Sequence, residues 1–447
     1  MTTELHIKKG LNINIIGDAP CDKSPINFTA KTCAITPDDF PGLTPKAIVA
    51  IGDYVKKGSP IIIDKHNPDI RLVSPSSGII TEIARGERRK ILHVTIETDE
   101  TNNSETFDCS DINNIDNARR LLMHSGLWAQ MRQRPFDIIP NPTKTPRDIF
   151  ITAFDSAPLA PNYDYILCDA EHELEAGVKL LKLFTQGNIY FSTRHDSLIK
   201  EIPGTTMVRI SGPHPAGNAG IQIANISPIN KGETIWTLDA ITLRRIGHLV
   251  INGTIDSATI VALTGSEIIQ PQYIKTIQGA KIDSLLDNEL KKERNTRIIS
   301  GNVLTGKNIG KHPYLRFPYN HITAIPEGDD VAEFMGWASI SPSKMSVSRT
   351  FPGHFLFKKK FSPDARILGG RRAMIMAGEY DKVLPMDIYA EYLLKAIISR
   401  NIDQMEALGI YEIAPEDFAL CEYVDTSKLE IQQIVREGLD YIRKELE

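Results

Sequence analysis

Two arginines at alternate positions are the first residues that could carry chemistry. In SGLWAQMRQRPF, residues 125–136, Arg132 and Arg134 flank a glutamine and precede Pro135 and Phe136. Guanidinium groups are planar, fork-shaped donors, and the Pro-Phe pair forms a rigid aromatic corner. Such a corner could hold an aromatic head group with carbonyl oxygens, or pair with acidic residues of a partner protein. A solvated surface turn is the simpler interpretation, and these residues alone favour it.

The same stretch has the borders of a nucleotide-cradling turn but lacks the glycines inside it. No glycine lies between Gly126 and Phe136. A phosphate loop needs glycines so that backbone N–H groups can approach the anion without a Cβ in the way. The loop has therefore either lost a ligand or never held one.

His214 is a second candidate, because it stands between two prolines in the segment GPHPAG. A histidine on so stiff a backbone could present its imidazole to a ligand. The simpler interpretation is that Pro-His-Pro shapes a loop and that the imidazole caps a backbone carbonyl.

Other catalytic motifs are missing or incomplete. The segment GNVLTGKN, residues 301–308, has Walker A spacing, but Asn308 replaces the hydroxyl residue that binds magnesium, and Gly310 and Pro313 follow too soon for a helix. The sequence has no HExxH, CxxC or GxSxG, so we expect no zinc hydrolase, no iron–sulfur cluster and no nucleophilic catalysis. The five cysteines are odd in number, which argues against a disulfide framework and favours a reducing, cytoplasmic compartment.

Length and composition indicate a folded, multidomain protein. The chain has 447 residues, 41% of them hydrophobic and 24% charged, and a net charge of −5. About three domains are expected at this length, and the scattered basic residues argue against a nucleic-acid partner. The N-terminus does not resemble a secretory signal, and the longest apolar runs fall far short of the roughly 20 residues of a membrane-spanning helix. Any membrane contact is therefore expected to be peripheral.

The first predicted element that could position these residues is a small β-sandwich over residues 47–96, where short apolar runs alternate with turn residues. GDYVKKGSPI and SPSSGIITEI resemble the lipoyl and biotinyl carrier fold. Lys65 falls close to the cofactor lysine of those carriers, but the longer tip around Asn67 and Pro68 favours a structural domain with a solvated Lys65.

The middle and end of the chain show three further patterns. From about Asp116 the sequence predicts a βαβ unit. Its expected elements are a helix ending near Gly126, a strand in DIFITAFDS, a strand or extension in YDYILC, a helix over 171–184 and a strand in GNIYFST. Residues 257–330 follow a β-grasp order of strand, strand, helix, strand, strand, with the helix near 281–290. After Pro385, apolar residues three and four apart predict a helical subdomain.

Several segments, taken together and in order, carry a resemblance to a known family. The chain resembles the A-subunit family (NqrA) of the sodium-translocating NADH:quinone oxidoreductases of bacterial respiratory membranes. The matching segments run from about Lys9 to the C-terminal helix and include GLNINIIG, GDYVKKG, SPSSGIITEIARGERRKI, SGLWAQMRQRPF, SGPHPAGNAG, RIISGNVLTG, FPGHFLF, GEYDKVLPMDI and DFALCEYV.

The resemblance implies a multidomain α+β fold with four units. These would be an N-terminal barrel-sandwich, biotinyl/lipoyl-like β domain over residues 1–110, an α/β domain over 111–256, a β-grasp, SLBB-like (ubiquitin-like) domain over 257–330, and a connecting segment with a C-terminal helical subdomain over 331–447. The α/β domain would be a degenerate relative of the flavin- and NADH-binding subunit of respiratory complex I. In that relative the loop reads SGL, a glycine-rich run and FP. Here the side chains from Trp128 to Arg134 would fill the space of a flavin phosphate, so the ligand would be lost and the fold retained.

The resemblance also implies a role in a membrane complex. The complex passes electrons from NADH, through flavins and iron–sulfur centres in other subunits, to ubiquinone and exports sodium. This chain would be its cofactor-free, peripheral component on the cytoplasmic side, without bound metal, and its partners would be mainly the membrane subunits B and C.

The resemblance further implies ubiquinone binding. The residues expected to carry it are Phe40, Pro41 and Gly42, then Arg132, Arg134, Pro135 and Phe136, and finally His214. Phe40 and Phe136 would stack on the ring while Arg132 or Arg134 donates to a carbonyl. The alternative is a structural component that docks on the membrane subunits without touching quinone. An exposed apolar surface continuous from the RPF loop to a cleft would favour the first role, and a flat acidic or apolar patch alone the second.

Overall fold

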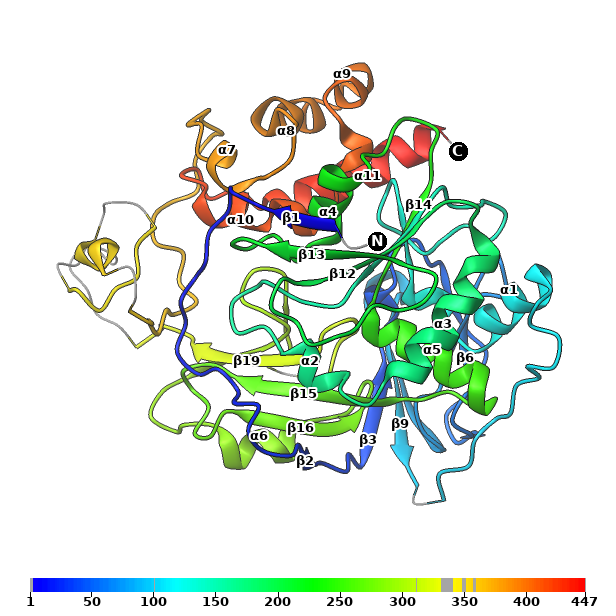
Figure 1. Ribbon diagram of the computed structural model, residues 1–447. Helices are drawn as coiled ribbons and strands as arrows, with labels where there is room; N and C mark the ends of the chain where they lie inside the picture. Colours follow the sequence, from blue (N-terminus) through cyan, green and yellow to red (C-terminus); the bar gives the residue numbers. More distant parts are fainter. Residues whose placement is uncertain are drawn as a thin grey trace.

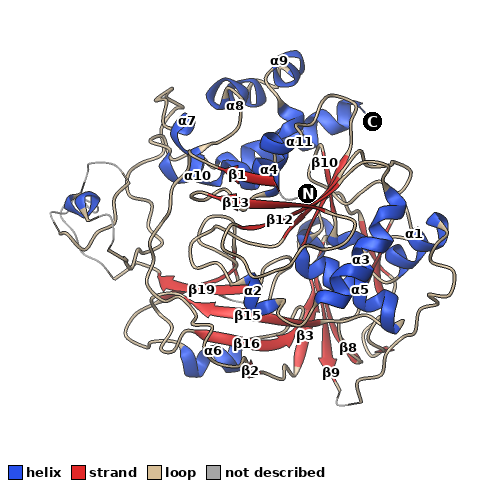
Figure 2. Ribbon diagram, viewed as in Figure 1, coloured by secondary structure: helices blue, strands red, loops and turns tan. Residues whose placement is uncertain are grey.

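Four sheets and a C-terminal group of helices make up the fold (Figures 1 and 2). The computed structural model describes residues 3–99, 101–310, 312–330, 341–347, 351–356 and 359–446. None of the helices within these ranges is long and apolar enough to cross a membrane. Three of the four predicted units contain the four sheets, and the fourth packs on the sheet of the α/β unit.

The predicted α/β unit contains a six-stranded sheet in the order β1-β13-β12-β11-β14-β10, with β10 antiparallel to β14 and the other pairs parallel. Its strands are β1 (Thr3–His6), β10 (Arg132–Arg134), β11 (Ile149–Thr152), β12 (Ile189–Arg194), β13 (Thr206–Ser211) and β14 (Ile235–Asp239). The N-terminal strand β1 pairs with β13, so residues expected in the β domain extend this sheet instead.

Alternate residues of the central strand β11 face two different helical layers. Ile149 and Ile151 belong to the core that contains residues of α3 (Glu171–Leu181) and α5 (Ala240–Asn252). Phe150 packs on the opposite side, in a cluster with Ile223 of α4 (Ala219–Ile226). The helix predicted before Gly126 is α1 (Ile115–His124). These helices hold the sheet, and therefore the loops at its strand ends, in place.

One predicted element of this unit is wrong. YDYILC was expected to be a strand or extension, but residues Tyr163–Ile166 form the short helix α2. The Asn162 side chain accepts hydrogen bonds from the backbone N–H groups of Asp164 and Tyr165, which is an N-cap interaction. The cap satisfies the free donors of the first turn, so the apolar residues that suggested a strand are taken into a helix.

The predicted small β-sandwich is present as two facing sheets. One has the order β3-β9-β8-β5 and the other the order β4-β6-β7. Lys65 is exposed in the turn after β6, in agreement with a solvated side chain. The strands are β3 (Thr32–Ile35), β4 (Pro45–Ala47), β5 (Tyr54–Val55), β6 (Pro60–Asp64), β7 (Arg71–Val73), β8 (Gly78–Arg85) and β9 (Ile91–Thr98).

The predicted β-grasp order is confirmed, with α6 (Asp283–Glu289) inside the expected range. Its sheet has the order β18-β17-β19-β15-β16-β2, so a short N-terminal strand completes one edge. Asn308 ends a strand instead of opening a helix, which agrees with the rejection of a phosphate loop there. The strands are β2 (Ile26–Asn27), β15 (Ala258–Thr264), β16 (Gln272–Ile277), β17 (Thr296–Ser300), β18 (Lys307–Asn308) and β19 (His321–Pro326).

The predicted C-terminal helices are also confirmed, and they lie beside β1, β13 and α4 in Figure 1. Their apolar faces share a core with Val208 and Ile210 of β13. This end of the chain is therefore a second helical layer on the α/β sheet. The predicted helices are α8 (Ala390–Ile398), α10 (Ala419–Val424) and α11 (Ile431–Leu446). Two short helices, α7 (Tyr380–Val383) and α9 (Ile402–Ala407), were not predicted.

Candidate functional site

The loop from Gly126 to Phe136 is filled by core side chains where the resembled phosphate loop has glycines. Trp128 begins the short 3-10 helix η3 (Trp128–Gln130) and is fully buried. Its indole packs edge-on against Trp236 at 5.1 Å and against Phe184 at 5.8 Å, and its Nε1 donates to the carbonyl of Pro140. Apolar side chains thus take up the interior of the turn, which leaves no backbone cradle for a phosphate.

Arg134 is buried in an ion cluster that joins β10 to the C-terminal helices. Its side chain is 1% exposed, and its guanidinium donates to Asp417 at 3.2 Å and to Glu416 at 3.0 Å. Asp137 lies 3.7 Å from its Nε. The guanidinium N–H groups that were expected to donate to a quinone carbonyl donate to these carboxylates instead. Arg134 therefore connects β10 to the C-terminal part of the chain.

Phe136 also faces the C-terminal helices, whereas Pro135 is half-buried. The Phe136 ring packs edge-on against Tyr411, with 6.1 Å between centroids. Its carbonyl accepts a hydrogen bond from Arg436 of α11. Arg134 and Phe136 are therefore internal contacts of the chain.

His214 is likewise internal, with 2% of its surface exposed. Ser156 Oγ accepts from the backbone N–H of Gly217 and lies 3.0 Å from His214 Nδ1, so its hydroxyl is free to donate to the imidazole. Burial lowers the pKa of His214 to about 4, so the ring is neutral near pH 7. The imidazole therefore contacts a serine hydroxyl and not the backbone carbonyl expected from the sequence, and its Nε2 is buried without a hydrogen-bond partner among the described residues.

Phe40 is the predicted residue that does line a pocket. It follows the 3-10 helix η1 (Pro37–Asp39), and its ring stacks on Phe317 with centroids 5.2 Å apart and planes 8° apart. Pro41 accepts a hydrogen bond from Ile139, and Gly42 adopts a φ of 89°, where an added Cβ would lie 2.8 Å from Ile138. Only a residue without Cβ fits so close an approach. Pro41 and Gly42 thus fix the loop that carries Phe40.

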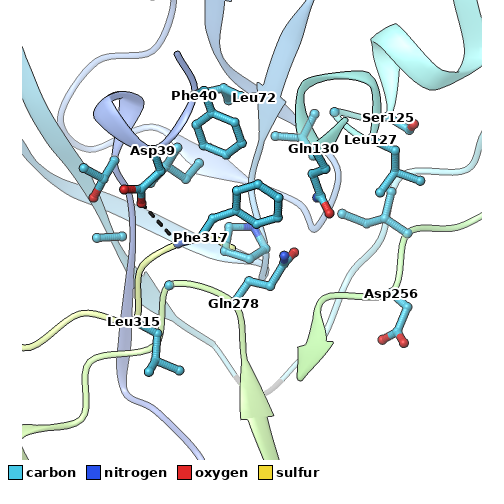
Figure 3. A pocket seen from close by; sticks show the side chains of 18 residues that line it. Asp39, Phe40, Leu72, Ser125, Leu127, Gln130, Asp256, Gln278, Leu315 and Phe317 are labelled. Carbon is cyan, nitrogen blue, oxygen red and sulfur yellow. Dashed lines mark hydrogen bonds between the residues drawn. The ribbon is translucent and has the colours of Figure 1, made fainter. Parts of the chain in front are cut away.

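The pocket lies where the β-sandwich, the α/β unit and the β-grasp unit meet (Figure 3). Its cavity volume is about 80 Å³, within about 640 Å³ of space outside the atoms that includes open solvent at its mouth. Gly126, Leu127 and Gln130 bring the degenerate loop to its wall, while Gln278 and Phe317 come from the β-grasp unit. The remaining lining residues are Ala34, Ile35, Thr36, Asp39, Phe40, Leu72, Val73, Pro75, Ser125, Ile255, Asp256, Gly279 and Leu315.

Arg132 supports the aromatic pair from outside the pocket lining. Its Nη2 donates to the carbonyl of Asp39 at 2.7 Å and its Nη1 to that of Ala129 at 3.0 Å. Its guanidinium carbon lies 5.6 Å from the centre of the Phe317 ring, a cation–π distance. These contacts hold Phe317 and the start of the Phe40 loop in one arrangement.

The two carboxylates of the pocket are both paired with arginines. The Asp39 carboxylate accepts hydrogen bonds from Nε and Nη2 of Arg316, at 2.6 to 2.9 Å, and from the backbone N–H of Phe317. Asp256 accepts from Arg244. Burial acts to raise the pKa of Asp256, but Arg244, the backbone N–H of Ala258 and Arg245 together outweigh it, so the pKa is lowered. Each carboxylate is thus offset by a paired arginine, so neither presents an uncompensated negative charge to the pocket.

The chemistry open to this pocket is non-covalent recognition of a flat ring with polar edges. Figure 3 shows the amide ends of Gln130 and Gln278 directed to the space beside the Phe317 ring. Amide N–H groups can donate to carbonyl oxygens, and the aromatic faces can stack on a conjugated ring. Within the described residues, no group of three or more histidine, cysteine or acidic side chains could hold a metal ion.

Phe317, Gln130 and Gln278 were missed by the sequence analysis. They follow no motif, and Phe317 is paired with the Phe40 loop across much of the chain, since Arg316 and Asp39 are 277 positions apart. The segment RFPYN around Phe317 repeats the Arg, Phe and Pro of the loop that was singled out, and this was the available signal.

Comparison with known proteins gives matches along most of the chain. Three family models match, described as the NqrA N-terminal barrel-sandwich hybrid domain over residues 5–99, the NqrA second alpha/beta domain over 114–255, and the NQRA C-terminal domain over 260–311. These confirm the predicted fold class. The boundaries proposed for the four units remain predictions.

Full-length relatives carry one name. The A-subunit of the Na(+)-translocating NADH-quinone reductase from Photorhabdus laumondii is 35% identical, over 99% of this chain and 100% of its own. The protein of the same name from Rhodopirellula baltica is 34% identical over 98% of each chain. Among solved structures, a chain of an NAD+-reducing NiFe-hydrogenase aligns with 75% of this chain and 63% of its own, at 13% identity and a TM-score of 0.41, too low to support any argument.

Proposed function

Because the chain belongs to the NqrA family of the Na(+)-translocating NADH-quinone reductases, we propose that it contributes a quinone-binding pocket to such a complex. As a member of that family it is one component of an oxidoreductase that translocates sodium. The pocket between Phe40 and Gln278 is the place we assign to the quinone ring. Flavins and iron–sulfur centres are assigned to the partner subunits, among them the membrane subunits B and C.

The stacked pair of Phe40 and Phe317 carries this proposal. Two nearly parallel rings at the wall of a largely apolar pocket provide a face on which a conjugated ring can stack. Gln130 and Gln278 supply donors at its edge, in the role first expected of Arg132 and Arg134. Both arginines already donate to groups of the chain itself, so a quinone carbonyl would have to displace those bonds.

Substitution of Phe317 by alanine tests the proposal. We expect short-chain ubiquinone to bind the purified full-length chain saturably, and Phe317→Ala to raise the Kd about tenfold, since an aromatic contact contributes about 1 kcal/mol beyond the area it buries. Equilibrium titration measures the Kd. Phe355→Ala is the matched control, because Phe355 is 66% exposed and does not line the pocket. An equal loss in both variants, or no saturable binding, would contradict a quinone site here.

A docking role is the second candidate, and one surface favours it. Tyr389 and Tyr392, 72% and 56% exposed, stand on and beside the start of α8 with 6.3 Å between their ring centres. Ile375 and Met376 are also exposed. They lie near α8, because the backbone N–H groups of the next two residues, 377 and 378, donate hydrogen bonds to Glu391 of that helix. Tyrosine and methionine are enriched in protein interfaces. We propose that this surface, residues 375, 376, 389 and 392, contacts another protein of the complex.

A double substitution distinguishes docking from quinone binding. Tyr389→Ser with Tyr392→Ser is expected to weaken assembly of the complex by about 2 kcal/mol or more, as for interface hot spots, and to leave quinone binding by the isolated chain unchanged. Co-purification of the complex measures assembly. Leu198→Ser is the control, since Leu198 is 85% exposed elsewhere on the chain. Wild-type assembly in the double variant would exclude this surface as the docking site.

A further inference from the structure

Arg245 of α5 is a buried arginine that forms no ion pair with a carboxylate of the described residues. Two arginines are buried in the described part of the chain, Arg134 and Arg245, with 1% and 3% exposed. Arg134 meets three carboxylates, whereas no carboxylate oxygen of the described residues lies within 4.0 Å of the Arg245 guanidinium. A buried charge without a close partner is costly, so such a group in a native protein calls for an explanation.

The hydrogen bonds of Arg245 are equally sparse. Its Nη1 lies 3.4 Å from Oε1 of Gln130, at the long end of the hydrogen-bond range, and its Nε has no partner among the described residues. The acidic groups nearest in the sequence and the fold are engaged elsewhere. Asp239 caps α5 through the N–H of Thr242, and Asp256 accepts from Arg244.

The charge of Arg245 is retained at neutral pH. Burial lowers its pKa to about 10, while Asp239 and Asp256 act in the opposite direction. The guanidinium is therefore a cation near pH 7. Its neighbour Arg244 adds positive charge, but that side chain is paired with Asp256 and Glu173.

Gln130 connects this cation to the pocket. The residue lines the pocket, and its Oε1 faces Arg245. An amide whose oxygen accepts from a cation directs its NH₂ group the other way, and Figure 3 shows the Gln130 side chain extending to the open space beside Phe317. The positive charge also polarises the amide, which strengthens the donor at its far end.

We infer that Arg245, acting through Gln130, makes the pocket select a quinone-type ring whose edge oxygen is ionised, such as a hydroxyquinone anion, over the neutral ring. This rests on the proposed quinone site and specifies its ligand further. Arg245 is a positioning residue in this arrangement, because Gln130 makes the contact. No bond is formed or broken, so the selection is a difference in binding free energy between the two forms of the ring.

The test compares two naphthoquinones that differ in charge. 2-Hydroxy-1,4-naphthoquinone is an anion at pH 7, and 2-methyl-1,4-naphthoquinone is neutral. We expect the wild-type full-length chain to bind the anion about tenfold more tightly, and Arg245→Met to abolish that ratio while the Kd of the neutral ring changes less than about twofold. Arg245→Lys should keep part of the ratio, and Gln130→Leu should lose it.

A pH series adds a reading that a structural role alone would not change. In the wild type, affinity for the hydroxyquinone should fall as the solution is acidified and the ligand is protonated, whereas in Arg245→Met it should stay flat. Arg120→Met is the matched control, since Arg120 is exposed on α1. Thermal denaturation of each variant verifies folding.

The outcomes separate the inference from the function on which it rests. Binding of the neutral ring with no preference for the anion, or an unchanged ratio in Arg245→Met, overturns the inference and leaves the quinone site standing. An equal loss for both rings assigns Arg245 a structural role only and also overturns it. If neither ring binds the wild type, the proposed quinone site itself is wrong.

Discussion

Replacing Arg134 by alanine is expected to lower the free energy of unfolding by about 3–5 kcal/mol. The guanidinium is 1% exposed and donates to Asp417, whose own side chain is fully buried, and to Glu416. Removing the cation leaves the Asp417 carboxylate buried with the N–H of Ala414 as its remaining donor from this network. Chemical denaturation of the isolated chain gives the change.

The loss of stability in Arg134→Ala should arise from the unpaired charge of Asp417, and the substitution Asp417→Asn, which removes that charge, tests this. In the double variant Arg134→Met with Asp417→Asn, no unpaired charge remains at the 417 position, so we expect less loss than the two single changes predict when added. Gly220 of α4 packs against this carboxylate so closely that an added Cβ would lie 2.2 Å from Asp417 Oδ2, which shows how little room is left for water. A loss below about 1 kcal/mol in Arg134→Ala would contradict this account.

The same variant bears on the alternative role of Arg134. A quinone-binding arginine would change affinity more than stability, whereas an arginine in an internal ion cluster changes stability first. We expect Arg134→Ala that is still folded to bind short-chain ubiquinone within about twofold of the wild type, because Arg134 does not line the pocket. A folded variant with binding abolished would return Arg134 to the site.

Replacing Trp128 by alanine is expected to cost about 3–5 kcal/mol of stability and to confer no affinity for a flavin nucleotide. The indole is fully buried between Phe184 and Trp236 and donates to Pro140. Its removal leaves a cavity in the core shared by the β-sandwich and the α/β unit. A phosphate would still be kept away from the backbone N–H groups by the Cβ atoms of the surrounding residues, which are not glycines.

Trp128→Phe provides the graded control for this prediction. Phenylalanine keeps an aromatic ring in the cluster but loses the indole N–H and part of the volume, so we expect about half the loss. Denaturation followed by the fluorescence of the two remaining tryptophans measures stability, and titration with flavin mononucleotide measures ligand binding. Tight flavin binding by Trp128→Ala would show that the side chain alone had closed an otherwise intact phosphate site.

Patterns between neighbouring residues anticipated much of the fold. The apolar spacing of α11 and the strand, helix, strand order of the β-grasp unit were legible because burial repeats with the local period of each element. YDYILC was misread because a single cap at Asn162 decided between helix and strand. The edge strands β1 and β2 could not be assigned, since their partners lie in sheets more than a hundred residues away.

The candidate site divides in the same way. The sequence by itself determined the family, the secondary structure elements and the loss of the glycines in the loop from Gly126 to Phe136, because each of these depends on residue identity at neighbouring positions. Only the tertiary structure decided that the Phe40 ring stacks on Phe317. The same holds for the ion pairs of Arg134 with Glu416 and Asp417, and for the contact between the buried Arg245 and Gln130. These pairings join residues far apart in the chain, and no local period records which distant side chain will neutralise a charge or complete a pocket.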